Sequence, residues 1–149
     1  MRIVVDANIL YSSLLNIDGE IAKLIFKSNK RLNFYSTNLL FEEILEHSDK
    51  LLKVTGLTKS ELRNQLSLLQ KKIKVVDVRL IPKNYIKSAI NILQDIDLDD
   101  VEYVALTDHI KGKLLTGDKI LIKGLQRKGW NKFISLRDIK LLSTSKRKR

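Results

Sequence analysis

The sequence has no cysteine, one proline, six glycines and two histidines among 149 residues. Without cysteine, disulfides and thiolate metal sites are excluded, and two histidines are too few for a metal site built on several imidazoles. Because proline and glycine are scarce, most of the chain is free to form regular structure. Hydrophobic residues make up 44% of the sequence, which excludes a disordered chain.

Long apolar runs are also missing. No stretch approaches the roughly 18 residues that a membrane-spanning helix needs. The first residues, Met1–Leu10, reach an aspartate too early for a signal peptide. With the lack of cysteine, this pattern predicts an intracellular, cytoplasmic protein.

Acidic residues are outnumbered: 28 Lys and Arg stand against 17 Asp and Glu, a formal net charge of +11. Such an excess favours polyanionic partners, because each phosphate neutralised by Lys or Arg releases condensed counterions. A basic solvated surface would give the same count, so charge alone leaves nucleic-acid binding open.

Short apolar or β-branched stretches alternate with stretches of helical periodicity. The expected strands are Arg2–Val5, Asn33–Tyr35, Ile73–Val78, Lys113–Thr116 and Lys132–Ile134. The expected helices include Asn8–Leu15, Asn38–Leu52, one opened by a capping box at Thr58, one after Pro82, one at Val101, one around Leu121 and Leu136–Leu142. This alternation predicts an α/β protein, a three-layer α/β/α sandwich with a central parallel sheet of about five strands.

One domain, residues 1–142, accounts for this pattern, and no linker or repeat divides it. Residues 143–149 contain no apolar residue and end in Lys-Arg-Lys-Arg, so we expect a basic, disordered tail that either contacts phosphate or stays solvated.

Three aspartates fall where parallel strands end or the next helix starts. Asp6 ends the first strand, Asp118 follows Lys113–Thr116, and Asp100 precedes the helix at Val101. Each one alone is explained by helix capping. Together they would converge at one edge of the sheet, where their mutual repulsion favours a divalent cation with a preference for oxygen ligands, Mg²⁺ or Mn²⁺. A basic protein with such a pocket suits the hydrolysis of nucleic acid.

Four segments in order resemble the signature blocks of the PIN domain: Val4–Leu10, Leu39–Leu45, Asp97–Thr107 and Leu114–Leu121. The resemblance covers Met1 to about Leu142. It implies a Mg²⁺/Mn²⁺-dependent nuclease, an endoribonuclease acting on single-stranded RNA. It also implies a homodimer and, as in many prokaryotic members, the toxin of a toxin–antitoxin pair with an antitoxin protein as partner.

The resemblance assigns the catalytic, metal-binding acids to Asp6, Glu43, Asp100 and Asp118. Helical geometry favours Glu43 over its neighbour Glu42, because Glu43 lies one turn beyond Leu39 and Leu40 and so borders the apolar face.

Other polar residues are expected to support the site. Asp97 either assists metal binding or shapes its turn, and we favour the turn. Asn8 either hydrogen-bonds the Asp6 carboxylate or a water, or caps the next helix. Thr116 orients a carboxylate or contacts phosphate, and Gly117 is expected to adopt an unusual backbone angle.

The remaining candidates are weaker. His47 and His109, with Asp108 beside the latter, are expected on the surface without a chemical role. Trp130, in a basic stretch, is the best exposed aromatic residue for stacking on a base.

Two other functions remain open. A PIN-like fold could bind RNA or a protein without cleaving it, although the four acids argue against this. An aspartyl-phosphate mechanism of the haloacid-dehalogenase type needs Asp-x-Asp after the first strand, and here the triplet is Asp6-Ala7-Asn8.

Overall fold

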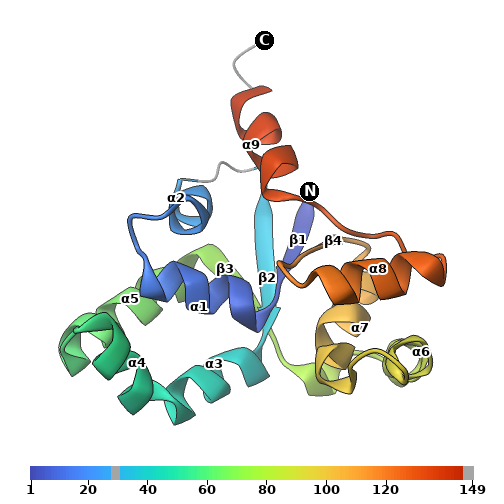
Figure 1. Cartoon of the computed structure of the whole chain (residues 1–149), viewed down its shortest axis with the longest axis horizontal. Helices are drawn as coiled ribbons and strands as arrows, with labels where there is room; N and C mark the ends of the chain where they lie inside the picture. The colour runs from blue at the N-terminus through green and yellow to red at the C-terminus, as the bar shows by residue number, and fades with distance from the viewer. Residues whose placement is uncertain (28–30, 146–149) are drawn as a thin grey trace.

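The computed structural model describes residues 1–27 and 31–145. Its centre is a parallel sheet of four strands in the order β3-β2-β1-β4 (Figure 1). The strands are β1 (Arg2–Val5), β2 (Asn33–Thr37), β3 (Ile73–Val76) and β4 (Lys113–Leu115). In register, Val4 of β1 lies beside Tyr35 of β2 and Leu114 of β4. The predicted α/β sandwich is therefore confirmed.

Helices cover both faces of the sheet (Figure 1). The α-helices are α1 (Ala7–Leu15), α2 (Glu20–Phe26), α3 (Asn38–Glu46), α4 (Ser48–Thr55), α5 (Lys59–Lys72), α6 (Lys83–Leu93), α7 (Val101–Ile110), α8 (Lys119–Arg127) and α9 (Leu136–Ser145). Two 3-10 turns, η1 (Val78–Leu80) and η2 (Leu98–Asp100), precede α6 and α7.

Alternate side chains of β1 enter two different cores. Ile3 and Val5 pack with α1, α2, α3 and α5, whereas Val4 packs with α6, α7 and α8. All three are fully buried. An apolar run without polar alternation is expected for a strand that is covered on both faces.

The strand expected at Lys132–Ile134 is reduced to a single bridge between Leu114 and Phe133. Leu114 donates its N–H to Lys132 O at 2.7 Å and accepts from the Ile134 N–H at 3.0 Å. Because α9 starts at Leu136, no room is left for a longer strand.

The helix expected over Asn38–Leu52 is two helices. α3 ends at Glu46 and α4 begins at Ser48, with His47 outside helical geometry at φ −101° and ψ 19°. His47 is both the C-cap of α3 and the N-cap of α4, and Asp49 lies in the first turn of α4, where an acid is favoured by the helix dipole.

Local signals elsewhere were reliable. The Thr58 side chain accepts from the Glu61 N–H at 3.1 Å, and the Glu61 carboxylate accepts from the Thr58 N–H at 3.1 Å, so the predicted capping box is present. The tail was predicted from residue 143, but α9 continues to Ser145, and residues 146–149 lie outside the described part. In that described part, no helix is both long and apolar enough to span a bilayer.

Candidate active site

A cavity of about 480 Å³ opens at the carboxyl edge of the sheet. Strands β1 and β2 run away from the N-terminus, so this edge lies low in Figure 1, beside the starts of α1, α3 and α7. Seven carboxylates line it: Asp6, Glu43, Asp97, Asp99, Asp100, Glu102 and Asp118. The structure therefore brings all four acids expected to be catalytic into one pocket, which we call the acidic pocket.

Asp6 is the most deeply placed of these acids. Its side chain is only 4% exposed, and its Oδ1 accepts a hydrogen bond from the Ile9 N–H at 3.0 Å, which caps α1. Burial raises the pKa of Asp6, and the charge of Asp118 adds to this. Hydrogen bonds from the Thr116 hydroxyl and the Ile9 N–H lower the Asp6 pKa in part.

Thr116 connects two of the acids. Its hydroxyl donates to Asp6 and accepts from the Asp118 N–H at 3.1 Å. Asp118 in turn caps α8, because its Oδ1 accepts from the N–H groups of Ile120 at 3.0 Å and Leu121 at 3.1 Å. Thr116, the buried residue directly after β4, thus fixes Asp118 relative to Asp6.

Asp100 lies at the start of α7, and its acidity is strongly perturbed. Burial, followed by the charges of Asp97, Asp6, Asp118 and Asp99, raises the pKa of Asp100 to about 7. These charges act together only because the segments that carry them meet in space.

Asp97 shapes its own turn. Its Oδ1 accepts from the Asp99 N–H at 2.9 Å and caps the 3-10 turn η2. This contact is the one that the sequence favoured for Asp97, and the residue also lines the acidic pocket.

Two acids of the pocket were not selected from the sequence, Asp99 and Glu102. Burial and the charges of Asp99 and Glu43 raise the pKa of Glu102. Its position in the first turn of α7, two residues beyond Asp100, was the available signal. Four aspartates crowd the preceding segment, Asp95–Asp100, so the sequence pointed to them and not to Glu102.

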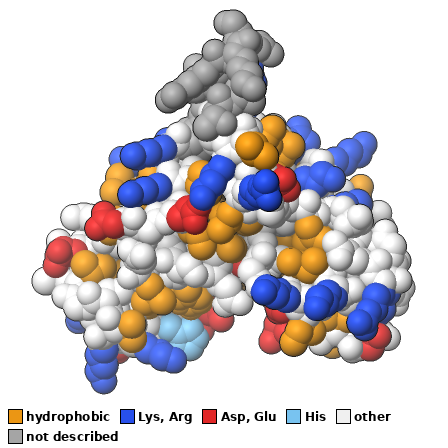
Figure 2. Space-filling view, turned by 45° about the horizontal axis from the view of Figure 1, so that its top comes forward, with side chains coloured by type: hydrophobic (Ala, Val, Ile, Leu, Met, Phe, Trp, Pro, Cys, Tyr) orange, Lys and Arg blue, Asp and Glu red, His pale blue; other side chains and the backbone are white. Residues whose placement is uncertain are grey.

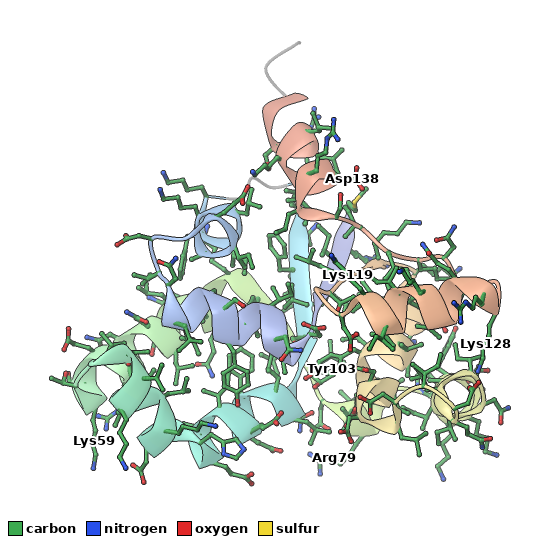
Figure 3. The ribbon with its side chains drawn as sticks, in the orientation of Figure 1. Lys59, Arg79, Tyr103, Lys119, Lys128 and Asp138 are labelled. Carbon is green, nitrogen blue, oxygen red and sulfur yellow. The ribbon has the colours of Figure 1, made fainter. Side chains whose placement is uncertain are left out.

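Tyr103 forms part of the wall behind these acids. It is 7% exposed, and burial, with the charges of Glu102 and Glu43 next, raises its pKa. Figure 3 shows Tyr103 at the lower end of the sheet, above Arg79.

The structure excludes one of the two alternatives for Asn8, and the expectation for Gly117 was wrong. Asn8 is not a helix cap, because Asp6 is the cap of α1 and Asn8 lies in its first turn, lining the acidic pocket. Gly117 does not need an unusual backbone angle: the positive φ values of glycine occur at Gly56 and Gly129 in the described chain. A Cβ at Gly117 would meet nothing within 4 Å.

The expected exposed aromatic residue is also a correction. Trp130 is 8% exposed, its Nε1 donates to Asp108 Oδ1 at 3.0 Å, and its ring packs edge-on against Phe133 at 5.0 Å. Asp108 also pairs with Lys132, so it is a half-buried structural residue. Trp130 therefore belongs to the core and is not a surface for stacking.

The donor set fits a divalent cation of the Mg²⁺ or Mn²⁺ type, which prefers carboxylate oxygen. Burial and mutual repulsion make it costly to keep these carboxylates charged, and both effects raise the pKa of Asp100. A bound cation would relieve both costs. Within residues 1–27 and 31–145, however, no three acidic or histidine side chains already form a compact metal-holding group. The carboxylates would have to move closer together to share an ion.

Comparison with known families decides the relationship. The profile of the PIN domain matches residues 4–140. The chain belongs to the PIN-domain family. The match includes the segments that carry Asp6, Glu43, Asp100 and Asp118, and PIN nucleases generally use divalent metals.

Solved structures resemble this PIN domain in fold. VapBC-1 of nontypeable Haemophilus influenzae matches at a TM-score of 0.66 and 15% identity, over 92% of this chain and 99% of the other. VapBC2 of Rickettsia felis, bound to a DNA fragment from its promoter, matches at a TM-score of 0.61 and 13% identity, over 91% of this chain and 97% of the other. A toxin–antitoxin complex from Klebsiella pneumoniae matches at a TM-score of 0.50 and 15% identity, over 77% of this chain and 85% of the other. The search of curated proteins gave no match.

Proposed function

We propose that this PIN domain is a metal-dependent endoribonuclease that hydrolyses phosphodiester bonds of single-stranded RNA. One observation carries the proposal: Asp6, Glu43, Asp100 and Asp118, from four separate segments, line a single cavity in a PIN-family chain. The net charge of +11, which the chain carries despite the acids of this pocket, favours a polyanionic substrate.

The residues of the acidic pocket have different roles in this proposal. Asp6, Glu43, Asp100 and Asp118 would hold one or two ions of Mg²⁺ or Mn²⁺, and such ions stabilise charge on the phosphate and activate water. Thr116 keeps Asp6 and Asp118 oriented through its two hydrogen bonds. A carboxylate of the pocket accepts the proton of the attacking water.

The biological setting follows from the neighbours in fold. Two are VapBC complexes and one is a toxin–antitoxin complex. We therefore propose that the chain is the toxin of such a pair, cytoplasmic, homodimeric and inhibited by an antitoxin protein. Light scattering of the purified chain tests the dimer. Co-purification with the product of an adjacent small reading frame tests the antitoxin.

The activity is tested by incubating the protein with end-labelled single-stranded RNA in Mg²⁺ or Mn²⁺, and again in EDTA. Asp6→Asn keeps a capping oxygen for Ile9 but removes the charge. Asp18→Asn is the matched control, because Asp18 is exposed in the turn before α2. We expect metal-dependent cleavage by the wild type and Asp18→Asn, and none by Asp6→Asn.

Two results would contradict the proposal. Tight RNA binding by the wild type without cleavage in any metal would favour a non-cleaving module. Cleavage that persists in EDTA, or in Asp6→Asn, would place the chemistry outside the acidic pocket.

A further inference from the structure

A second cavity, of about 640 Å³, adjoins the acidic pocket between α1, α8 and the segment that leads into α9. Asn8 lines both cavities. Thr116 and Gly117 line the second one and directly precede Asp118 of the first. We call this second cavity the side groove. An RNA strand with one phosphate at the acidic pocket would therefore place its neighbouring nucleotide beside the side groove.

The side groove combines apolar walls with a hydrogen-bonding rim. Ile9, Ile122 and Phe133 are among its apolar residues, and Gln126 and Asn131 lie at its rim. Gln126 Nε2 donates to Asn131 Oδ1 at 3.1 Å. That bond does not use the Gln126 carbonyl or the Asn131 N–H₂ group, so the rim keeps one acceptor and one donor, the combination that the edge of a base requires.

Basic side chains also lie along α8, the helix that carries Gln126. Lys119, Lys123 and Arg127 recur every four residues on α8, so they share one exposed side of it. In the described chain, none of them is part of an ion pair, whereas the adjacent Lys128 pairs with Asp95. Figure 3 shows Lys119 at the end of α8 beside the sheet and Lys128 at the far end. The row is available for phosphates that lead away from Asp118.

The surface agrees with this arrangement. Figure 2 shows hydrophobic side chains in the middle of one face, with Lys and Arg side chains around them and a row of these at the lower right. An apolar floor with cations beside it suits a chain of bases and phosphates better than a neutral apolar partner.

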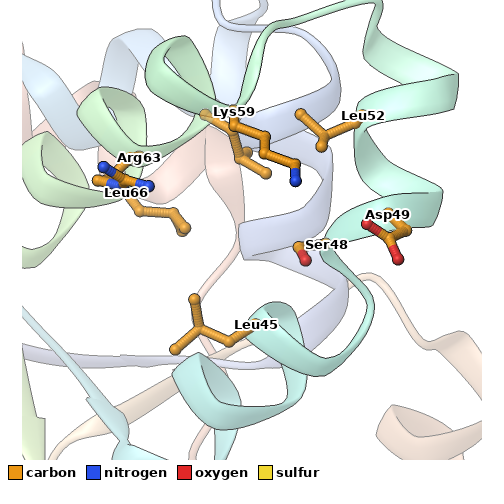
Figure 4. Close-up of a pocket in the computed structure, with 8 residues that line it drawn as sticks. Leu45, Ser48, Asp49, Leu52, Lys59, Arg63 and Leu66 are labelled. Atoms are coloured by element: carbon orange, nitrogen blue, oxygen red, sulfur yellow. The ribbon is translucent and has the colours of Figure 1, made fainter.

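A different cavity makes a useful contrast. It measures about 260 Å³ and lies between α3, α4 and α5, lined by residues such as Leu52, Lys59 and Arg63 (Figure 4). It shares no residue with the acidic pocket. Its position gives no route from the acids, so it does not compete for the same strand.

We propose that the side groove binds the nucleobase next to the scissile phosphate, while Lys119 and Lys123 bind the following phosphates. This subsite rests on the proposed nuclease function and extends it, since it makes the enzyme read bases as well as backbone. The row on α8 contributes affinity for any strand, and the groove contributes the dependence on a base.

Two substitutions can close the groove without disturbing the fold. Ser12 is exposed on α1 and lines the groove, so Ser12→Leu fills it from one wall. Gly117 lies on the ridge towards Asp118 with open space around its missing Cβ, so Gly117→Leu fills it from the other side without backbone strain. Ser67→Leu, at an exposed position of α5, is the matched control.

The experiment measures binding in EDTA, where cleavage is absent, to two fluorescent probes of equal length. One is a single-stranded oligouridylate, and the other is its abasic ribose-phosphate counterpart. We expect the wild type and Ser67→Leu to bind the base-bearing probe about fivefold to a hundredfold more tightly than the abasic one. In Ser12→Leu and Gly117→Leu this ratio should approach one.

The cations are tested in parallel. Lys119→Gln combined with Lys123→Gln should weaken both probes by the same factor and reduce the salt dependence of binding. The pair Lys83→Gln and Lys87→Gln, with the same spacing on α6, should change neither the affinity for the two probes nor the salt dependence of binding. A base-to-abasic ratio that is unchanged in both groove variants overturns the subsite, even if the wild type cleaves RNA with Mg²⁺. A wild type that neither binds nor cleaves RNA overturns the proposed function as well.

Discussion

Asp6→Asn should change stability and activity in opposite directions. Asp6 is 4% exposed and faces Asp118 and Asp100 across the acidic pocket, and burial with like charge raises its pKa. Replacing the carboxylate with an amide removes this repulsion, while the amide oxygen can still accept from the Ile9 N–H that caps α1. In EDTA at mildly alkaline pH, the variant should therefore be more stable than the wild type.

The size of the effect follows from the charges involved. Burial of a carboxylate and repulsion by a neighbouring like charge are each worth on the order of 1 kcal/mol per pKa unit, so we expect a gain of about 1–2 kcal/mol. For a chain of this length that corresponds to a rise in melting temperature of about 2–8 °C. Cleavage of RNA and the binding of Mg²⁺, which need the charge, should both be lost.

Thermal unfolding followed by circular dichroism, with EDTA and then with saturating Mg²⁺, measures both sides of this prediction. Ligand at a hundredfold excess over its dissociation constant stabilises the native state by about 2.7 kcal/mol. We expect such a rise for the wild type and none for Asp6→Asn. A variant that melts below the wild type in EDTA, or that still gains stability from Mg²⁺, would refute the reasoning.

Other predictions concern single groups. Burial and neighbouring acids raise the pKa of Asp100 from 3.8 to about 7, so its stabilising contribution is complete below pH 3.8 and is lost as the pH rises through about 7. In EDTA the free energy of unfolding should fall across this window by about 1–2 kcal/mol, reduced for partial exposure, and urea titrations of Asp100→Asn should show a flatter profile. Thr58→Ala removes the capping box of α5 and should cost about 1 kcal/mol in a urea titration while leaving RNA cleavage unchanged. Trp130→Phe leaves Asp108 without the indole donor and should cost about 1–2 kcal/mol in the same titration, again with unchanged cleavage.

Local signals in the sequence predicted much of the fold. β1 is a nearly continuous apolar run, as expected for a buried parallel strand, and the capping box marked the start of α5. The failures came where tertiary context competes with local pattern. Lys132–Ile134 has strand character but too little length before α9, and Trp130 is buried in a core cluster where Asp108 accepts from its indole N–H.

The candidate site was predictable where chemistry is tied to a strand end. Asp6 and Asp118 follow their strands directly, and Asp100 precedes α7. Glu102 was harder to single out, because the burial that raises its pKa most depends on how α7 packs, and the charges of Asp99 and Glu43 only add to it. Gly117 was misjudged, since a glycine in a turn suggests backbone freedom and here it leaves open space instead.

Three of the acids also begin helices: Asp6 begins α1, Asp100 begins α7 and Asp118 begins α8. The amino ends of three helix dipoles consequently point towards the same cavity, each equivalent to roughly half a positive charge. Backbone amides thereby offset part of the negative charge that the side chains concentrate there. An incoming phosphodiester would meet an electrostatically mixed surface, attractive to anions through its main chain and to cations through its carboxylates.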